Sequence, residues 1–303
     1  MNLITRSDLD GLTCAVLLKE VEIIERITFA HPRDVQDRTL DVTENDILTN
    51  LPYHPDCGMW FDHHSSEEER LDIPAAFEGR FEVAPSAARV VYNHYRSHRF
   101  HKYDYLVSQV DKVDSAQLSV EDVTEPSGWV LVSYITDPRT GLGRYHDYGI
   151  SNKDLMHRMI DLIGTHSAEE ILAMRDIRQR VRRYFEQEDE FRAFLQKASK
   201  RDGNVVLTDT RGMAEVPTGN RFLVYTLFPE ANISVRVMDG RDGMNAVITI
   251  GHSIFNRTSR TNVGELCAKH GGGGHRKVGT IQVEGDYADD TLAVVLEQIK
   301  KDG

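Results

Sequence analysis

The sequence predicts an α/β protein with a larger N-terminal domain built on a parallel sheet and a smaller C-terminal α/β domain. Three observations predict this fold class. The length of 303 residues is near the size at which one hydrophobic core gives way to two domains. Short apolar runs alternate with helix-like patterns in the first part of the chain. A charged helical stretch then ends at a turn, RDGN, and a second series of strand-like runs follows it. We therefore predict domains over 1–200 and 204–303.

The N-terminal domain is expected to alternate strands with helices. Its predicted strands cover 3–5, 27–30, 46–51 and 58–61, and its predicted helices cover 14–21, 87–95 and 103–113. Cys14, Leu17, Leu18 and Val21 recur at the spacing of one helix face. Ser65 with Glu68, or Ser66 with Glu69, has the spacing of a capping box.

The second half of the chain begins with a loop and long helices and continues as strands. Residues 137–149 are rich in turn formers, whereas 167–200 are densely charged and lack Gly and Pro. One or two long helices are therefore expected to end the first domain. In the second domain, the predicted strands cover 205–208, 222–227, 233–238, 246–250 and 280–283, and the predicted helices cover 263–269 and 290–300.

The net charge and the cysteine content limit the partners and the cofactors that this protein is expected to bind. Lys plus Arg total 36 against 48 Asp plus Glu, so the formal net charge is -12. The negative electrostatic potential that this charge produces disfavours binding to long nucleic acid or to an anionic membrane. A phosphorylated substrate would need local cations or a metal to bind. The three cysteines, Cys14, Cys57 and Cys267, form neither a disulfide framework nor a CxxC zinc motif. Without an N-terminal signal pattern or a long apolar run, the protein is expected to be cytoplasmic.

Three polar clusters fall where the predicted strands end or on a nearby helix. Asp8 and Asp10 follow the first strand, and Asp62-His63-His64 follows the run MWF. Asp111 and Asp114 lie one helical turn apart. Each cluster alone is weak evidence, because a D-x-D-G loop is usually a turn and helical aspartates usually face solvent. Ligands of open parallel sheets gather beyond the carboxyl ends of the strands, and carboxylates with imidazoles suit Mn²⁺ or Mg²⁺.

The second domain contains a run of four glycines, Gly271, Gly272, Gly273 and Gly274, followed by His275. Ordering four glycines costs chain entropy, and their N–H groups can form an anion-binding nest beside a histidine that donates to phosphate. The alternative is a flexible hinge, which the closely flanking apolar patterns disfavour. Arg257 and Arg260 can clamp phosphate oxygens, although an ordinary solvated loop is about as consistent with their spacing.

Together these motifs resemble the DHH phosphoesterases that carry a DHHA1 domain. D-x-D-G, Asp62-His63-His64, a later helical aspartate and GGGGH occur in the family's order over nearly the whole chain. The resemblance implies a DHH domain and a DHHA1 domain with the active-site cleft between them. It also implies that Mn²⁺ or Mg²⁺ activates water for in-line attack on phosphorus. The family includes nanoRNases, 3′-phosphoadenosine 5′-phosphate phosphatases, cyclic-dinucleotide phosphodiesterases and, more distantly, exopolyphosphatases.

The resemblance also implies roles for individual residues. Asp8 and Asp10 match the carboxylates of the first motif, and His63 matches the metal-binding histidine. His64 matches the histidine that faces the scissile phosphate, and Asp62 matches an acid on the metal or one contact away from it. Asp111 matches the metal-binding aspartate that the family has on a later helix, and Asp114 is the less favoured alternative. The residues that match the substrate-holding part of the DHHA1 domain are Gly271, Gly272, Gly273, Gly274 and His275, with Arg257 or Arg260.

Two residues depart from the family pattern. Arg6 stands where the family has a histidine, and Asn50 stands where it has a bridging aspartate. A guanidinium cannot ligate a metal and repels a divalent ion, so we expect one tightly held Mn²⁺ or Mg²⁺. Asn50 can offer it a carbonyl oxygen, and Arg6 replaces the other ion electrostatically, paired with Asp8 or touching a substrate phosphate. The alternative is that Arg6 is a structural salt-bridge partner and a second ion arrives with substrate.

The sequence thus predicts a metal-dependent hydrolase of small phosphorylated substrates. Short oligonucleotides, cyclic or linear dinucleotides, nucleotide phosphates and polyphosphate all fit, whereas long nucleic acid and membranes do not. The alternative is a protein of this fold with weakened catalytic activity that binds nucleotides or phosphate. A homodimer is one option for its assembly.

Overall fold

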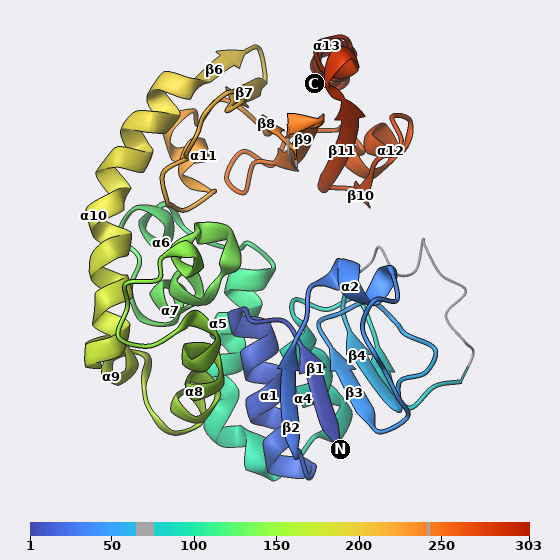
Figure 1. Ribbon diagram of the computed structural model, residues 1–303, viewed down its shortest axis with the longest axis vertical. Helices are drawn as coiled ribbons and strands as arrows, with labels where there is room; N and C mark the ends of the chain where they lie inside the picture. The colour runs from blue at the N-terminus through green and yellow to red at the C-terminus, as the bar shows by residue number, and fades with distance from the viewer. Residues whose placement is uncertain (65–75, 241–242) are drawn as a thin grey trace. The chain divides into compact units, whose positions relative to one another are not determined.

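The computed structural model describes residues 1–64, 76–240 and 243–303, and it forms two compact units (Figure 1). Unit 1 contains Met1–Leu118 and Pro126–Tyr184, and unit 2 contains Ser119–Glu125 and Phe185–Gly303. The capping boxes predicted at Ser65 and Ser66 lie outside the described residues. No helix in the described ranges is long and apolar enough to cross a membrane.

Unit 1 is built on a five-stranded parallel sheet with the strand order β2-β1-β3-β4-β5. The strands are β1 (Asn2–Thr5), β2 (Arg26–Phe29), β3 (Asp46–Thr49), β4 (Met59–Asp62) and β5 (Gly79–Phe81). The chain passes from β1 to β2 on one side and returns to place β3 on the other side. Their order therefore reverses between β1 and β3, the position at which open α/β sheets bind ligands.

The helices of unit 1 lie mainly on one face of this sheet (Figure 1). They are α1 (Leu9–Val21), α2 (Pro32–Gln36), α4 (Ala87–Tyr95), α5 (Asp104–Asp114), α7 (Gly128–Thr136), α8 (Asn152–Thr165), α9 (Ala168–Ala173) and the first part of α10 (Arg175–Ala198). α1 packs on β1 and on α4, and α4 packs on β4 and β5. On the opposite face, Ile4, Leu48 and Trp60 form a buried cluster with Val35 of α2. Alternating side chains therefore give the sheet two buried faces, as parallel sheets require.

Sequence periodicity did not predict α7 and α8. All but the first residue of α7, Gly128, are buried, so this helix has no polar stripe to reveal the helical period. The predicted helices at 14–21, 87–95 and 103–113 correspond to α1, α4 and α5. The stretch 167–200 corresponds to α9 and α10, which are separated at Met174.

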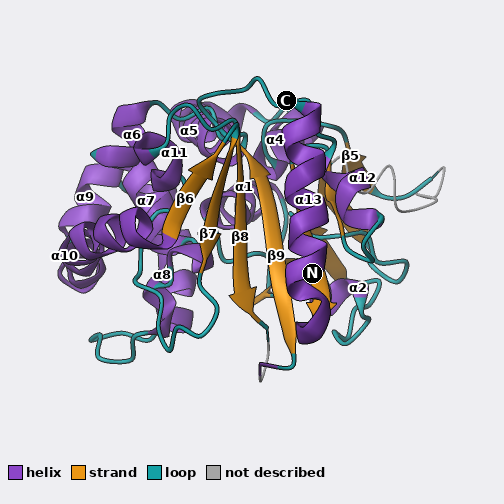
Figure 2. Cartoon of the chain, turned by 90° about the horizontal axis from the view of Figure 1, so that it is seen from above, coloured by secondary structure: helices purple, strands orange, loops and turns teal. Residues whose placement is uncertain are grey.

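Unit 2 contains a six-stranded mixed sheet with the order β10-β11-β9-β8-β7-β6. Its strands are β6 (Ser199–Asp202), β7 (Val205–Asp209), β8 (Ile233–Asp239), β9 (Asn245–His252), β10 (Gly273–His275) and β11 (Val278–Glu284). Its helices include α6 (Val120–Thr124), α11 (Leu223–Leu227), α12 (Val263–Ala268) and α13 (Ala288–Asp302). Figure 2 shows α13 lying along the strands, where Val295 and Ile299 join a core with Val235, Ile248 and Ile281.

The strand predicted at 222–227 is wrong, because this segment forms the short helix α11. Its residues, FLVYTL, favour strands, which explains the prediction. Asn220 instead accepts the N–H of Phe222 at 3.0 Å and turns the chain into the helix. The hydroxyl of Tyr225 then bonds the carbonyl of Gly251 in β9 at 3.0 Å. Tertiary contacts thus override the local strand preference.

Candidate active site

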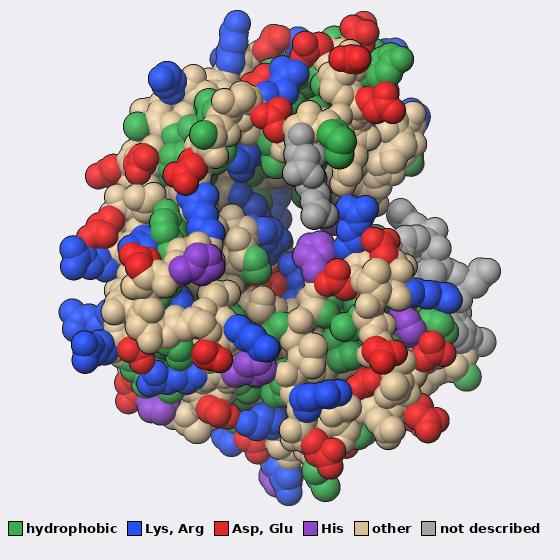
Figure 3. Space-filling model, viewed as in Figure 1, with side chains coloured by type: hydrophobic (Ala, Val, Ile, Leu, Met, Phe, Trp, Pro, Cys, Tyr) green, Lys and Arg blue, Asp and Glu red, His purple; other side chains and the backbone are tan. Residues whose placement is uncertain are grey.

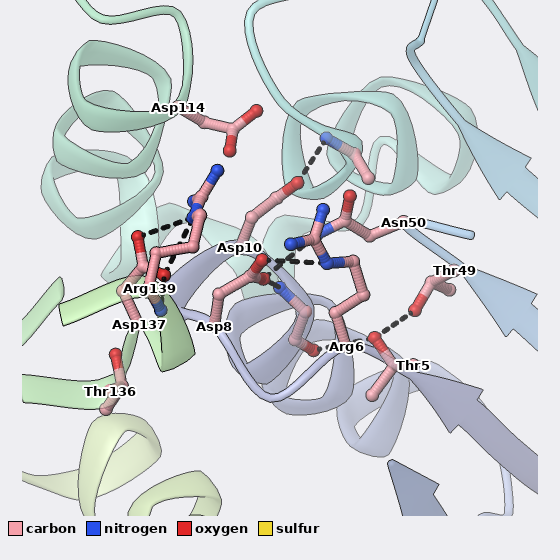
Figure 4. A network of polar contacts seen from close by, with 12 residues as sticks. Thr5, Arg6, Asp8, Asp10, Thr49, Asn50, Asp114, Thr136, Asp137 and Arg139 are labelled. Atoms are coloured by element: carbon pink, nitrogen blue, oxygen red, sulfur yellow. Dashed lines mark hydrogen bonds and ion pairs between the residues drawn. The ribbon is translucent and has the colours of Figure 1, made fainter. Parts of the chain in front are cut away.

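The carboxyl ends of β1, β3 and β4 meet at one edge of the parallel sheet in unit 1. Asp8 and Asp10 follow β1, Asn50 follows β3, and Asp62 ends β4. Figure 4 shows Asp8, Asp10 and Asn50 close together at the start of α1. A hydrogen bond of 2.8 Å between Thr49 and Thr5 joins the neighbouring strand ends just below them. The sheet topology therefore brings together the polar clusters that the sequence singles out.

Asp8 has both carboxylate oxygens engaged within unit 1. Its Oδ1 accepts the N–H of Gly11 at 3.1 Å, as the N-cap of α1, and the side-chain amide of Asn50 at 3.0 Å. Its Oδ2 pairs with Nε of Arg6 at 3.0 Å (Figure 4). Asn50 has a positive φ of 54°, which asparagine tolerates better than most residues. The guanidinium of Arg6 therefore neutralises the carboxylate of Asp8.

Asp10 is buried and binds the N-terminus of α4. Its two oxygens accept the N–H groups of Ala87 and Ala88 at 2.9 and 2.8 Å. Burial, and then repulsion from Asp114 and Asp8, nevertheless raises the pKa of Asp10 well above its ordinary value. These carboxylates crowd one another in the protein alone, and a divalent cation among them would relieve the repulsion.

The Asp62-His63-His64 motif directs its two imidazoles differently. His63 donates from Nδ1 to the carbonyl of Ala84 at 3.0 Å. Its Nε2 faces the carboxylates of Asp114 at 3.2 Å and of Asp10 at 3.8 Å. His64 instead pairs through Nδ1 with Asp62 at 2.8 Å. Burial alone would lower the pKa of His64, but the Asp62 carboxylate raises it to about 9.

The structure places Asp114, rather than Asp111, beside His63. Both oxygens of Asp111 are held elsewhere, by the hydroxyl of Ser86 at 2.7 Å and by the guanidinium of Arg89 at 2.6 and 2.9 Å. Ser86 caps α4, whose first N–H groups hold Asp10. Asp111 thus supports the helix that positions Asp10, and the geometry favours the aspartate that the sequence ranked second.

Asp10, His63 and Asp114 have the arrangement of a divalent-metal site. One ligand atom from each lies within 4.8 Å of the other two. The Nε2 of His63 is buried and has no hydrogen-bond partner in the described part of the chain. A second group, Asp62 with His63 and His64, shares that histidine. Oxygen and imidazole ligands without thiolates fit Mn²⁺ or Mg²⁺, and the ring of His63 is already oriented by the carbonyl of Ala84.

The sequence reading missed one charged pair at this site. Asp137 and Arg139 lie in the loop after α7, and the carboxylate holds Nε of the guanidinium at 2.8 and 3.0 Å. Figure 4 shows both residues beside Asp8, Asp10 and Asp114. The only signal in the sequence was the turn-forming composition of residues 137–149, which is typical of a loop rather than of a site.

In unit 2 the glycine run forms the edge strand β10 and the turn before it. The N–H groups of Gly271 and Gly272 donate to the carbonyls of Ala268 and Cys267 at the end of α12, at 3.1 and 2.9 Å. Gly273 and Gly274 pair with β11. This pairing favours an ordered segment over a hinge.

Of the other predicted residues of unit 2, His275 ends β10, and Arg257 and Arg260 lie in the segment between β9 and α12. His275 accepts the N–H of Lys277 at 3.4 Å. Arg257 donates from Nε to the carbonyl of Ile254 at 2.8 Å, and the backbone N–H of Arg260 donates to Gly303 at 3.1 Å. Arg236 in β8 was missed. Its Nε is buried without a partner among the described residues, and burial lowers its pKa.

Comparison with known proteins identifies a full-length relative and a more distant shared fold. No family model matches the chain, and no curated protein matches it. The chain is 42% identical to PggH, a pGpG-specific phosphodiesterase from Vibrio cholerae, with a TM-score of 0.82. That match covers 100% of this chain and 99% of the other. RecJ from Thermus thermophilus, solved in complex with Mn²⁺, has a TM-score of 0.55 at 14% identity. The match covers 99% of this chain and 52% of RecJ, and it concerns the fold alone.

Proposed function

The chain belongs to the DHH/DHHA1 family of metal-dependent phosphoesterases, and on that premise we propose that its substrate is a short linear dinucleotide of the pGpG type. The proposal is supported by the 42% identity to a pGpG-specific phosphodiesterase over the whole chain. The observation that supports metal-dependent hydrolysis is the buried Nε2 of His63, which faces the carboxylates of Asp10 and Asp114 at 3.8 and 3.2 Å. Hydrolysis of the phosphodiester in pGpG would give two molecules of GMP.

We propose that Asp10, His63 and Asp114 hold the divalent ion. Mn²⁺ or Mg²⁺ bound there would supply Lewis-acid activation of the phosphate and of the attacking water. Asp114 replaces Asp111 in this assignment, because Asp111 is occupied by Arg89 and Ser86. The carbonyl of Ala84 keeps the proton of His63 on Nδ1, which presents Nε2 as the ligand atom.

His64 is the proposed proton donor to the leaving oxygen. Asp62 holds Nδ1 of His64 at 2.8 Å and favours the protonated ring, while 34% of the His64 side chain remains exposed. An imidazolium oriented by a buried carboxylate can deliver a proton as the bond from phosphorus to the leaving oxygen breaks. The Oδ2 of Asp62 has no hydrogen-bond partner in the residues described, so it can also turn toward the ion.

We propose that the protein holds one tightly bound ion, because Arg6 occupies the position of the other. Arg6 lies 3.0 Å from Asp8, and Asn50 and Gly11 use the remaining oxygen of Asp8. A calorimetric titration with Mn²⁺ in the absence of substrate should therefore give one high-affinity site per chain. The variant Arg6→His exchanges the cation for a ligand and should add a second site.

Electron paramagnetic resonance gives an independent count, because two Mn²⁺ ions held a few ångströms apart would be spin-coupled. Two high-affinity, spin-coupled ions in the unaltered protein would contradict the single-ion proposal. The result would not affect the assignment of Asp10, His63 and Asp114 as ligands.

Short substrates should be cleaved in preference to long single strands. The net charge of -12 gives no general attraction to a polyanion, and the face seen in Figure 3 intersperses acidic with basic side chains over its outer surface. We expect pGpG to exceed a long single-stranded oligonucleotide in kcat/KM by roughly 100-fold, about 3 kcal/mol in transition-state free energy. Chromatographic rate measurements with both substrates at several salt concentrations test this. Tight, steeply salt-dependent binding of the long strand would contradict it.

For unit 2 we propose a role in holding phosphate or nucleotide. Candidate donors are the N–H groups at Gly273 and Gly274 and the side chains of His275, Arg257 and Arg260. Arg236 joins them, because a buried guanidinium nitrogen without a partner is costly and an anionic ligand would satisfy it.

A further inference from the structure

Arg139 is held rigidly by its neighbour Asp137 at the edge of the carboxylate cluster. The two residues belong to a one-turn 3-10 helix, Pro138–Thr140, that follows α7. Asp137 caps this turn by accepting the backbone N–H of Arg139 at 2.8 Å. The same carboxylate accepts Nε of the Arg139 side chain at 2.8 and 3.0 Å. Asp137 therefore fixes both the backbone and the guanidinium of Arg139.

The terminal nitrogens of Arg139 remain available. Asp137 binds only Nε, and among the described residues no other hydrogen bond to the guanidinium of Arg139 occurs. The Arg139 side chain is 47% exposed, whereas that of Asp137 is 10% exposed. Figure 4 shows the free end of the guanidinium directed toward Asp114. The terminal end of the guanidinium thus points toward Asp114, one of the proposed ligands of the ion.

The electrostatics agree with this placement. Burial alone would lower the pKa of Arg139, but Asp137 raises it above its ordinary value, and Asp8 and Asp114 raise it further. Arg139 therefore interacts electrostatically with Asp8 and Asp114 as well as with its partner Asp137. Its positive charge is permanent at the edge of the site.

Resting on the phosphoesterase function proposed above, we propose that Arg139 is a catalytic residue whose terminal N–H groups bind a nonbridging oxygen of the phosphate under attack. Asp137 is its positioning residue. As the oxygen of water bonds to phosphorus and the bond to the leaving oxygen breaks, the nonbridging oxygens carry negative charge. A guanidinium already fixed in place stabilises that charge without reorganising at the moment of reaction.

The test compares Arg139→Ala and Arg139→Lys with Arg144→Ala. Arg144 is an exposed arginine of the same loop that lies over the ring of Tyr145, so it is a matched control. With pGpG and Mn²⁺, Arg139→Ala should lower kcat by about 100-fold, the usual effect of removing one charge-stabilising donor. Arg139→Lys should recover part of the loss, and Arg144→Ala should match the unaltered protein.

Two further measurements separate catalysis from a structural role. Added guanidinium salt should restore part of the activity of Arg139→Ala and should have no such effect on Asp137→Ala, which keeps the arginine. Calorimetric Mn²⁺ affinity should not fall in Arg139→Ala, because the substitution removes a cation and no proposed ligand. Unchanged kcat in Arg139→Ala would overturn the inference, and so would a loss of activity accompanied by a matching loss of thermal stability without guanidinium rescue.

Failure of the proposed substrate remains distinguishable from failure of this inference. If the unaltered protein cleaved no dinucleotide, the proposed function would be wrong. The role of Arg139 would then be decided by calorimetric binding of inorganic phosphate in the presence of Mn²⁺. Arg139→Ala should weaken that binding about tenfold through loss of a charge-assisted contact. Equal phosphate affinity in Arg139→Ala, Arg144→Ala and the unaltered protein would overturn the inference.

Discussion

Alanine at His63 or at Asp114 is expected to reduce turnover of pGpG by roughly 10³-fold, about 4 kcal/mol of transition-state stabilisation. Each side chain contributes one of the three ligand atoms that lie within 4.8 Å of one another. Loss of one ligand from a three-residue set should also weaken metal binding by roughly 10- to 100-fold or more. Steady-state kinetics and calorimetric Mn²⁺ titration of the two variants measure the two effects separately.

Asp111→Asn is the matched control for Asp114→Ala. Asp111 lies one turn away on the same helix, but its carboxylate binds Ser86 and Arg89. The substitution should weaken the start of α4 and cost about 1 to 3 kcal/mol of stability, with Mn²⁺ affinity largely retained. The opposite pattern, in which Asp111→Asn loses the metal and Asp114→Ala keeps full turnover, would show that Asp111 is the ligand.

A single methyl group at Gly274 should disrupt the edge strand of unit 2. Gly274 has a φ of 154°, and a Cβ there would lie 2.3 Å from the carbonyl oxygen of Val278 and 2.4 Å from the Cα of Gly279. Both obstacles are backbone atoms of β11, so β10 must separate from its partner to accept alanine. We expect Gly274→Ala to lower the free energy of unfolding by about 3 kcal/mol and to weaken substrate binding.

Gly273→Ala provides a control within the same strand. A Cβ on Gly273 would meet no atom within 4 Å, so this variant should stay within about 0.5 kcal/mol of the unaltered protein. Denaturant unfolding and KM for pGpG should be compared for the two variants. Equal stability of the two would mean that β10 is not held against β11. A stable Gly274→Ala protein with unchanged KM would count against a substrate-binding role for the glycine run.

Local patterns were enough to predict the fold class and to place acidic residues at the strand ends. Short apolar runs alternating with helical periodicity identified β1, α1, β2, β3 and β4 in order, because strand and helix spacing are read over a few residues. The positions of Asp8, Asp10 and Asp62 at strand ends followed from the same reading. Because parallel strands bring their carboxyl ends to one edge of the sheet, the convergence of these residues could be expected from the sequence.

Contacts between distant segments decided the remaining features. Asp111 and Asp114 share one face of α5, and only the packing of that helix shows that Arg89 takes the first while the second faces His63. Arg139 gives no signal in a turn-rich loop, and it lies beside the carboxylate cluster because it is paired with Asp137 at the end of α7. The segment 222–227 has strand-forming residues, yet Asn220 and Tyr225 hold it as a helix. The sequence by itself determined which chemical groups are available and which strands carry them. The tertiary structure decided which of them meet, because helix rotation and loop placement depend on packing between segments that are far apart in the chain.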